Sequence, residues 1–280
     1  MSGFAEWISA LRASARLTPA ANAVLDTVER APNEASYRSA QAIADASDVN
    51  VATVVRAAQT LGFSGWPAFS TEVRARYLAS LSSKNLYLHN RSEGQMQAMI
   101  TQDISLLERM RGETEENALN RMAECIVSAR STGVFATGSY AAPGLQLSHV
   151  SQMLGYPVRL HSGSVTSMVN EVSLLSEADC FLAITLWKSS KAVVQLAEAA
   201  KRQGAGVLVI SDRHTSLTEM ADEYALVPAE SSDLISSLVC VTSAVQYLLG
   251  CLARHDEERT QSRLGNIDEL WGITSAVVGE

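Results

Sequence analysis

The chain has 280 residues, 47% of them hydrophobic and 19% charged. This composition excludes wholesale disorder and allows two domains. The apolar runs are far shorter than the roughly 20 residues that a membrane span needs, and the charged N-terminus is unlike a secretory signal. The four cysteines are widely spaced, and the five histidines show no metal-ligand spacing. We therefore expect a cytoplasmic protein with reduced thiols and with no metal, cofactor or membrane partner.

The net charge of −8 is distributed unevenly along the chain. Residues 1–80 contain seven basic and seven acidic side chains, so the other 200 residues carry all of the excess negative charge. Such asymmetry indicates two domains with different partners. The neutral part can present a locally basic face to DNA, whereas the acidic part approaches nucleic acid with difficulty.

Residues 18–77 show short helical periods separated by tight breaks and no strand-like run. Thr18-Pro19 predicts a helix start, and Ala31-Pro32-Asn33 predicts its end. A second helix is predicted to begin at Ser39. We expect an all-α domain here.

A brief break at Ser47-Asp48-Val49 precedes a third predicted helix, which has Asn50 as its N-cap and Gly62 just past its end. Two short helices joined by a three-residue break are typical of a helix-turn-helix. Val54, Ala58 and Leu61 form a stripe that can face the core. The opposite side carries Ala52, Thr53, Arg56 and Gln59, which either contact base edges or form an ordinary solvated face.

The segment VNVATVVRAAQTLGFSGWPAF (49–69) resembles the helix-turn-helix of RpiR-family transcriptional regulators. The pattern of that family is close to V-S-x-A-T-V-x-R-x-x-x-x-L-G-F-x-G-[YF]-x-x-F. In this chain Asn50 replaces the Ser as an equally good cap, and Asp48 stands where the family commonly has Gly. The resemblance covers residues 18–69 and implies operator binding. The DNA-contacting candidates are Asn50, Ala52, Thr53, Arg56 and Gln59, with Arg38 and Arg74 as candidates for phosphate contacts.

The polar stretch 81–95 is interpreted as a linker. The two segments that follow it have helical spacing, and in the first of them an apolar stripe is formed by Met99, Ile104, Leu107 and Met110.

Between residues 133 and 253, short β-rich runs alternate with amphipathic helical stretches. This alternation predicts an α/β domain with a doubly wound parallel sheet. Such sheets bind ligands at the carboxyl ends of their strands, where loops and helix N-termini supply donors to anions. The candidate loops are 137–140, 162–164, 187–190 and 212–216.

Residues 115–253 resemble the sugar-isomerase (SIS) domain, which the same family carries after its helix-turn-helix. One hallmark is the strand pattern D-x-x-x-x-I-[ST], matched by Asp179, Ile184 and Thr185. In members that bind sugar phosphates, the loop after the third strand is close to S-x-S-G-x-T, and its hydroxyl groups hold the phosphate. Here the loop reads T-L-W-K-S-S. Thr185 and Ser190 keep the first and last hydroxyl groups, while Trp187 and Lys188 replace Ser and Gly.

The resemblance therefore implies an anion site, although a degenerate loop in which Trp187 is packed and Lys188 solvated is the alternative. In the first loop the hydroxyl group comes from either Ser139 or Tyr140. The candidate ligand-binding residues are Ser139, Tyr140, Thr185, Trp187, Lys188, Ser189, Ser190 and Ser216.

Related SIS domains also serve aldose–ketose isomerases, which need a positioned base. His149 and Glu171 lie inside predicted helices, and His161 and His214 have no evident acidic partner in the sequence. We therefore predict no catalytic residue and no enzyme activity. The alternative is a sugar-phosphate isomerase or binding protein whose helical N-terminus serves dimerisation.

Four regions are predicted: a helix-turn-helix domain (1–80), a linker with a connecting helix (81–114), the SIS-type domain (115–253) and a C-terminal amphipathic helix (254–280). The resemblance implies a transcriptional regulator of carbohydrate or related metabolism genes. It would act as a homodimer or homotetramer on a palindromic operator. A small anionic metabolite, such as a sugar phosphate, would control its affinity for the operator.

Overall fold

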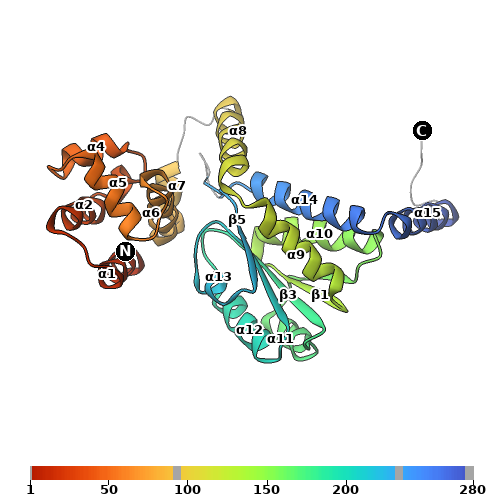
Figure 1. The fold of residues 1–280 in the computed structure, drawn as a ribbon. Coiled ribbons are helices and arrows are strands. Elements are labelled where there is room, and N and C mark those ends of the chain that lie inside the picture. The colour runs from red at the N-terminus through yellow and green to blue at the C-terminus, as the bar shows by residue number, and fades with distance from the viewer. Residues whose placement is uncertain (1, 91–95, 231–235, 275–280) are drawn as a thin grey trace. The chain divides into compact units, whose positions relative to one another are not determined.

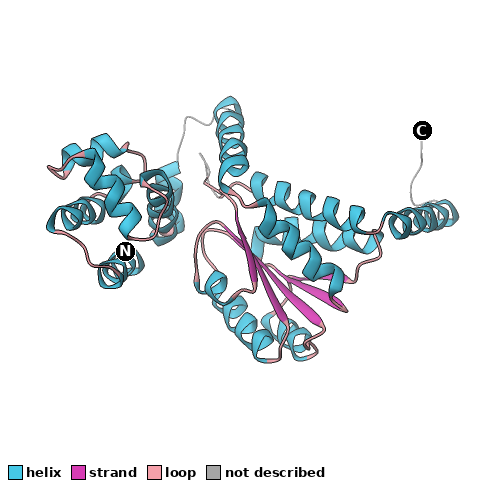
Figure 2. Ribbon diagram, viewed as in Figure 1, coloured by secondary structure: helices cyan, strands magenta, loops and turns pink. Residues whose placement is uncertain are grey.

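The structure is a computed structural model that describes residues 2–90, 96–230 and 236–274 (Figure 1). It divides into two compact units, residues 1–93 and residues 94–231 with 236–280. The first unit is helical, and the second combines a parallel sheet with helices (Figure 2). This confirms the predicted fold class. Among the described helices, none is long and apolar enough to cross a membrane.

The first unit is built around a single apolar core. The residues of this core that are fully buried include Ile8, Val24, Leu25, Ile43, Val54 and Phe69. Its helices are α1 (Ser2–Ser14), α2 (Pro19–Arg30), α3 (Pro32–Ala35), α4 (Ala40–Ala46), α5 (Val51–Thr60), α6 (Trp66–Ser80) and α7 (Ser83–Asn90).

The predicted capping residues stand at the N-termini of three helices, as expected. The side chains of Thr18, Ser39 and Asn50 accept hydrogen bonds from the first turns of α2, α4 and α5. In the break between α4 and α5, Asp48 adopts a φ of 51°, and Gly62 follows α5 with a φ of 91°. Both values lie in the left-handed region, which Gly adopts freely and Asp tolerates.

Four helices of this unit, α1, α3, α6 and α7, were not predicted. Helix α1 buries Phe4 and Ile8 in the core. Helix α7 occupies most of the segment interpreted as a linker, because Leu86 is buried in spite of its polar neighbours. The two compact units divide at 93/94, within the region 81–114 predicted as a linker with a connecting helix, and residues 91–95 of the predicted linker lie outside the described residues.

The second unit holds a five-stranded parallel sheet in the order β2-β1-β3-β4-β5. Its strands are β1 (Ser131–Phe135), β2 (Val158–His161), β3 (Asp179–Thr185), β4 (Gly206–Ser211) and β5 (Glu223–Leu226). The helices are α8 (Met96–Glu113), α9 (Glu116–Ser128), α10 (Ala141–Met153), α11 (Val165–Ser173), α12 (Lys191–Arg202), α13 (Ser216–Met220), α14 (Val239–His255) and α15 (Glu257–Thr274).

Alternating side chains of the strands bury both faces of the sheet. Leu182 and Leu208 pack with α9, α10 and α14, whereas Phe181 and Val207 pack with α11, α12 and α13 (Figure 1). The chain moves outward from β1 to β2 and then returns past β1 to β3, so the helices that follow β1 and β3 lie on opposite faces. The adjacent carboxyl ends of β1 and β3 therefore form the topological switch point, where sheets of this kind bind ligands.

The apolar stripe predicted for α8 faces the core only at Met110, which is half-buried against it. Leu106 is fully buried, whereas Met99, Ile104 and Leu107 are exposed. Two polar contacts fix this orientation: Arg109 pairs with Glu230 at 2.9 Å, and the hydroxyl group of Ser237 donates to Asp103 at 2.7 Å.

The C-terminal helix is present as α15, and its apolar side chains are half-buried or exposed. Residues 275–280 of the predicted C-terminal region lie outside the described residues.

Candidate functional site

Helix α5 presents the predicted DNA-reading face. Val54 and Ala58 are buried in the domain core, and the side chains of Ala52, Arg56 and Gln59 are exposed. The Oδ1 atom of Asn50 accepts hydrogen bonds from the Thr53 N–H at 2.8 Å and from the Thr53 hydroxyl group at 3.0 Å. The cap thus fixes both side chains at the N-terminus of the helix, the part that such motifs direct at base edges.

The three predicted DNA-contacting arginines have different surroundings. In the described ranges, no hydrogen bond or ion pair engages the guanidinium group of Arg56, which is exposed. Arg38 is exposed and pairs with Glu34 at 2.6 Å. Arg74 donates twice to the carbonyl oxygen of Ser36, at 3.0 and 2.6 Å, and its guanidinium carbon lies 4.5 Å from the ring centroid of Tyr37. These contacts give Arg74 a structural role within the domain, and its phosphate contact stays a prediction.

In the second unit, the predicted anion loop joins β3 to α12. The Thr185 hydroxyl group donates to the Ser189 Oγ at 3.2 Å. Ser190 is the N-cap of α12, and its side chain makes no hydrogen bond to the described first turn of that helix. The N–H groups of this turn are therefore left for another acceptor, and a helix N-terminus favours an anion in that position.

The centre of this loop is a three-residue turn. The Lys188 N–H donates to the carbonyl oxygen of Leu186 at 2.6 Å, and Trp187 between them has a φ of 56°. A γ-turn with positive φ at its central residue is rare and strained. The Lys188 ammonium group lies 4.6 Å from the Trp187 ring centroid, which is cation–π geometry. Trp187 is half-buried and Lys188 is exposed, so the cation that replaces the family's glycine is available at the surface.

Two residues that were not among the predicted ligand-binding residues lie at the carboxyl end of β4, beside this loop. Asp212 accepts a hydrogen bond from the Trp187 N–H at 2.9 Å and pairs with Arg213 at 2.7 Å. The Ser211 side chain is buried, and within the described part of the chain its Oγ atom has no hydrogen-bond partner. Ser211 pairs in register with Thr185, so both lie on the face of the sheet that α12 covers.

The electrostatics of the strand ends follow from burial. Burial raises the pKa of Asp212, and Arg213 and the Trp187 N–H oppose this shift by favouring the carboxylate. Burial and the nearby charge of Asp212 raise the pKa of Tyr140, in the loop after β1, to about 12, although its hydrogen bond with Ser236 acts in the opposite direction. The phenol of Tyr140 is therefore neutral at physiological pH and can donate a hydrogen bond.

The other predicted ligand residues lie at neighbouring positions. Ser139 follows β1 in a short 3₁₀ helix and is exposed. Ser216 is exposed at the first position of α13, where Thr215 provides the cap. The sheet thus brings together the loops after β1, β3 and β4 at one edge. A direct contact of Ser139 or Ser216 with an anion stays a prediction.

His161 has an acidic neighbour that the sequence did not reveal. Its Nε2 atom lies 4.0 Å from Glu171 on α11, and its ring stacks on Phe135 at a centroid distance of 5.0 Å. Burial lowers the pKa of His161, while Glu171 acts to raise it. The pair lies at the end of the edge strand β2, and β1 separates it from the β3 loop.

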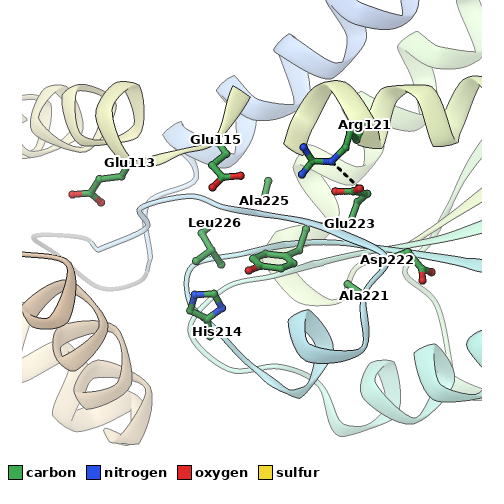
Figure 3. A pocket seen from close by; sticks show the side chains of 10 residues that line it. Glu113, Glu115, Arg121, His214, Ala221, Asp222, Glu223, Ala225 and Leu226 are labelled. Atoms are coloured by element: carbon green, nitrogen blue, oxygen red, sulfur yellow. Dashed lines mark hydrogen bonds and ion pairs between the residues drawn. The ribbon is translucent and has the colours of Figure 1, made fainter. Parts of the chain in front are cut away.

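A cavity of about 410 Å³ lies along β5, and no predicted site residue lines it (Figure 3). Its charged lining is mainly acidic, comprising Glu113, Glu115, Asp222 and Glu223 together with Arg121. The Arg121 guanidinium group pairs with Glu223 at 2.8 Å. This cavity is unsuited to an anion.

The fold and these sites define a class of protein: a helix-turn-helix unit joined to a doubly wound sheet whose strand ends offer hydrogen-bond donors to an anion. A family model described as "Helix-turn-helix domain, rpiR family" matches residues 3–80. An uncharacterized HTH-type transcriptional regulator from Haemophilus influenzae is 24% identical over 218 residues, which are 75% of each chain.

Two solved structures share the fold. The NanR protein of Vibrio vulnificus, complexed with ManNAc-6P, has a TM-score of 0.63 at 16% identity over 97% of this chain and 99% of that one. The sugar isomerase domain of an RpiR transcription factor from Sphaerobacter thermophilus has a TM-score of 0.59 at 20% identity, covering 62% of this chain and 97% of that one. Residues 3–80 therefore form a helix-turn-helix domain of the rpiR family, and the second unit has the sugar isomerase fold.

Proposed function

We propose that this protein is a DNA-binding transcriptional regulator of carbohydrate or related metabolism genes, and that a small anionic metabolite controls its operator affinity. The exposed face of α5 carries the proposal, because its cap and core packing leave Arg56 and Gln59 directed away from the domain. The match of residues 3–80 to the rpiR family and the names of the relatives support the same function.

Sequence reading is assigned to α5. Arg56 would donate two hydrogen bonds to a guanine edge, Gln59 would pair with an adenine edge, and the methyl group of Thr53 would contact thymine. Asn50 and Ala52 complete this surface at the start of the helix. Arg38 would exchange its exposed partner Glu34 for a DNA phosphate, which adds affinity without sequence information.

The effector site is assigned to the loop between β3 and α12. The uncapped first turn of α12, the Lys188 ammonium group and the buried hydroxyl group of Ser211 all offer donors to an anion. The Vibrio vulnificus protein of similar fold is complexed with a sugar phosphate, which supports this ligand class here. Trp187 adds an aromatic surface on which the apolar face of a sugar ring can pack.

A homodimer or homotetramer completes the proposal, because two helix-turn-helix units related by symmetry read a palindromic operator. Helix α8 supports an oligomer, since Met96, Ile100 and Ile104 are 75%, 46% and 52% exposed on a single chain. Sedimentation velocity of the full-length protein should show a species of twice or four times the chain mass.

The deciding experiment compares the DNA upstream of the protein's own gene with a scrambled duplex across a salt series. We expect selective binding whose affinity falls steeply with salt, because released counterions supply much of the affinity. Sugar phosphates are then tested for release of the complex. Equal binding to both duplexes at every salt concentration, extended to a genome-wide selection of fragments, would contradict the proposal.

A second function, aldose–ketose isomerisation, is favoured by one observation, the pairing of His161 with Glu171. A histidine beside a carboxylate can shuttle protons between adjacent carbons. Incubation of the protein with aldose and ketose phosphates should show no interconversion if the protein only senses them. Turnover that disappears in the His161→Asn variant would favour the enzyme.

A further inference from the structure

A backbone hydrogen bond joins the anion loop to a neighbouring loop. Trp187 adopts a φ of 56°, a region that bulky side chains avoid, and the only hydrogen bond that closes the described turn itself is Lys188 N–H to Leu186 O. Such a conformation persists only where the surroundings hold it. The hydrogen bond from the Trp187 N–H to Asp212, 2.9 Å long, is a contact of this kind from the end of the adjacent strand.

Asp212 is itself fixed in place. Its other carboxylate oxygen accepts from Arg213 at 2.7 Å, and the two side chains are 13% and 11% exposed. Arg213 also balances the carboxylate charge, which would otherwise repel an anion bound beside it. Ser211, the preceding residue, pairs with Thr185, so the register of β3 and β4 sets Asp212 beside the turn.

We propose that Asp212 is the positioning residue of the anion loop: by holding the Trp187 backbone, its carboxylate orients the Lys188 ammonium group toward a ligand at the N-terminus of α12. The inference rests on the proposed function only for the presence of the ligand. The charge of Asp212 also acts on Tyr140, so a single carboxylate influences both loops of the switch point.

The chain offers a matched control in Asp222. This carboxylate also accepts a backbone hydrogen bond, from the Val207 N–H at 2.8 Å, and it also pairs with a cation, Lys201 at 3.1 Å. It lies at the start of β5, next to the start of β4 and so at the opposite edge of the sheet. Loss of Asp222 therefore removes the same kinds of bond without touching the anion loop.

The experiment uses the full-length protein labelled with 5-fluorotryptophan. The four tryptophans of the protein then give separate ¹⁹F signals. The Trp187→Phe variant assigns the signal of Trp187. The variants Asp212→Ala, Asp212→Asn and Asp222→Ala are then compared, with inorganic phosphate and glucose 6-phosphate as the two probes. Phosphate alone reports the anion cradle, and the sugar phosphate adds contacts with the ring.

In Asp212→Ala, we expect the Trp187 signal to shift and the affinity for both probes to fall about tenfold. Asp212→Asn should restore the signal and most of the affinity, because its amide oxygen still accepts from the Trp187 N–H. Asp222→Ala should leave both unchanged. An unmoved Trp187 signal in Asp212→Ala would overturn the inference, as would a moved signal with unchanged affinity. If the wild-type protein binds neither probe, the proposed effector site fails, and the ¹⁹F comparison still decides whether Asp212 holds the turn.

Discussion

Replacing Arg56 with Ala tests the assignment of α5 most directly. Its guanidinium group is exposed and free of internal partners in the described ranges, so the substitution removes no contact that stabilises the domain. A bidentate contact with a guanine contributes about 1–3 kcal/mol of discrimination. Arg56→Ala should therefore weaken operator binding by roughly 5- to 150-fold and relax specificity at one base pair.

Arg74→Ala is the informative comparison, because this side chain makes two hydrogen bonds to the Ser36 carbonyl oxygen and lies over the Tyr37 ring. Its loss should lower the free energy of unfolding by about 1–3 kcal/mol, measured by urea denaturation. Its DNA affinity should fall equally for operator and scrambled duplexes.

Fluorescence anisotropy with labelled operator and scrambled duplexes, at two salt concentrations, separates the two roles. The Arg56 variant should lose affinity for the operator alone and keep the wild-type unfolding midpoint. An equal loss on both duplexes, with the slope of log affinity against log salt reduced by about one, would show that Arg56 is a phosphate contact and would refute its assignment to base reading.

Three further outcomes are expected. Lys188→Ala should abolish release of the operator by the effector while leaving operator affinity intact, as anisotropy would show; an unchanged response would remove Lys188 from the site. Asp179→Asn should lower the free energy of unfolding by about 2–4 kcal/mol, because the carboxylate is buried and accepts from Arg130, Ser131 and Ser176. Burial alone would raise the pKa of Asp179, but these hydrogen bonds lower it. The carboxylate therefore contributes to the free energy of unfolding above the unfolded pKa near 4, and this contribution is lost as the pH falls further. Denaturation at pH 7 and pH 3 should show a smaller difference in the free energy of unfolding between wild type and variant at the lower pH. Asp48→Gly should raise the free energy of unfolding by about 1 kcal/mol, since Gly adopts a φ of 51° without strain, and a lower unfolding midpoint would contradict this.

The helix-turn-helix could be predicted in detail because its signals are local. Thr18, Ser39 and Asn50 cap helices through side chains three residues from the groups they bind, and Gly62 ends α5 by its own backbone preference. Helix α7 also has a capping serine, since the Ser82 Oγ accepts from the Asn85 N–H at 3.2 Å, but that cap does not say which unit the helix joins. Its place in the first unit depends on the burial of Leu86, which is a tertiary contact.

The order of strands and helices in the second unit was also predictable, but the orientation of α8 was not. The apolar spacing of its residues is compatible with two faces, and the helix buries Leu106 while most of the stripe that contains Ile104 is exposed. The deciding contacts join Arg109 to Glu230 and Asp103 to Ser237, more than 100 residues away in sequence. Helical periodicity holds no information about such partners.

The anion site was predicted only in part for the same reason. The family pattern pointed to Thr185, Trp187 and Ser190, which lie within one loop. Asp212 supports that loop because β3 and β4 are neighbours with Thr185 opposite Ser211, a relation that follows from the register of the sheet. Its signal in the sequence was a carboxylate directly after a predicted strand, which marks a candidate loop without identifying its partner.

Ser211 provides a test of whether this loop binds a ligand. Its hydroxyl group is buried, and in the described structure it has no hydrogen-bond partner. Burying such a group without a partner is unfavourable, so Ser211→Ala should keep or raise the free energy of unfolding, by up to about 1 kcal/mol. If the hydroxyl group serves a bound anion, the same substitution should weaken phosphate affinity. A variant that is more stable and binds phosphate more weakly would show that the unpartnered group is retained for binding. A variant with unchanged phosphate affinity would exclude Ser211 from the site.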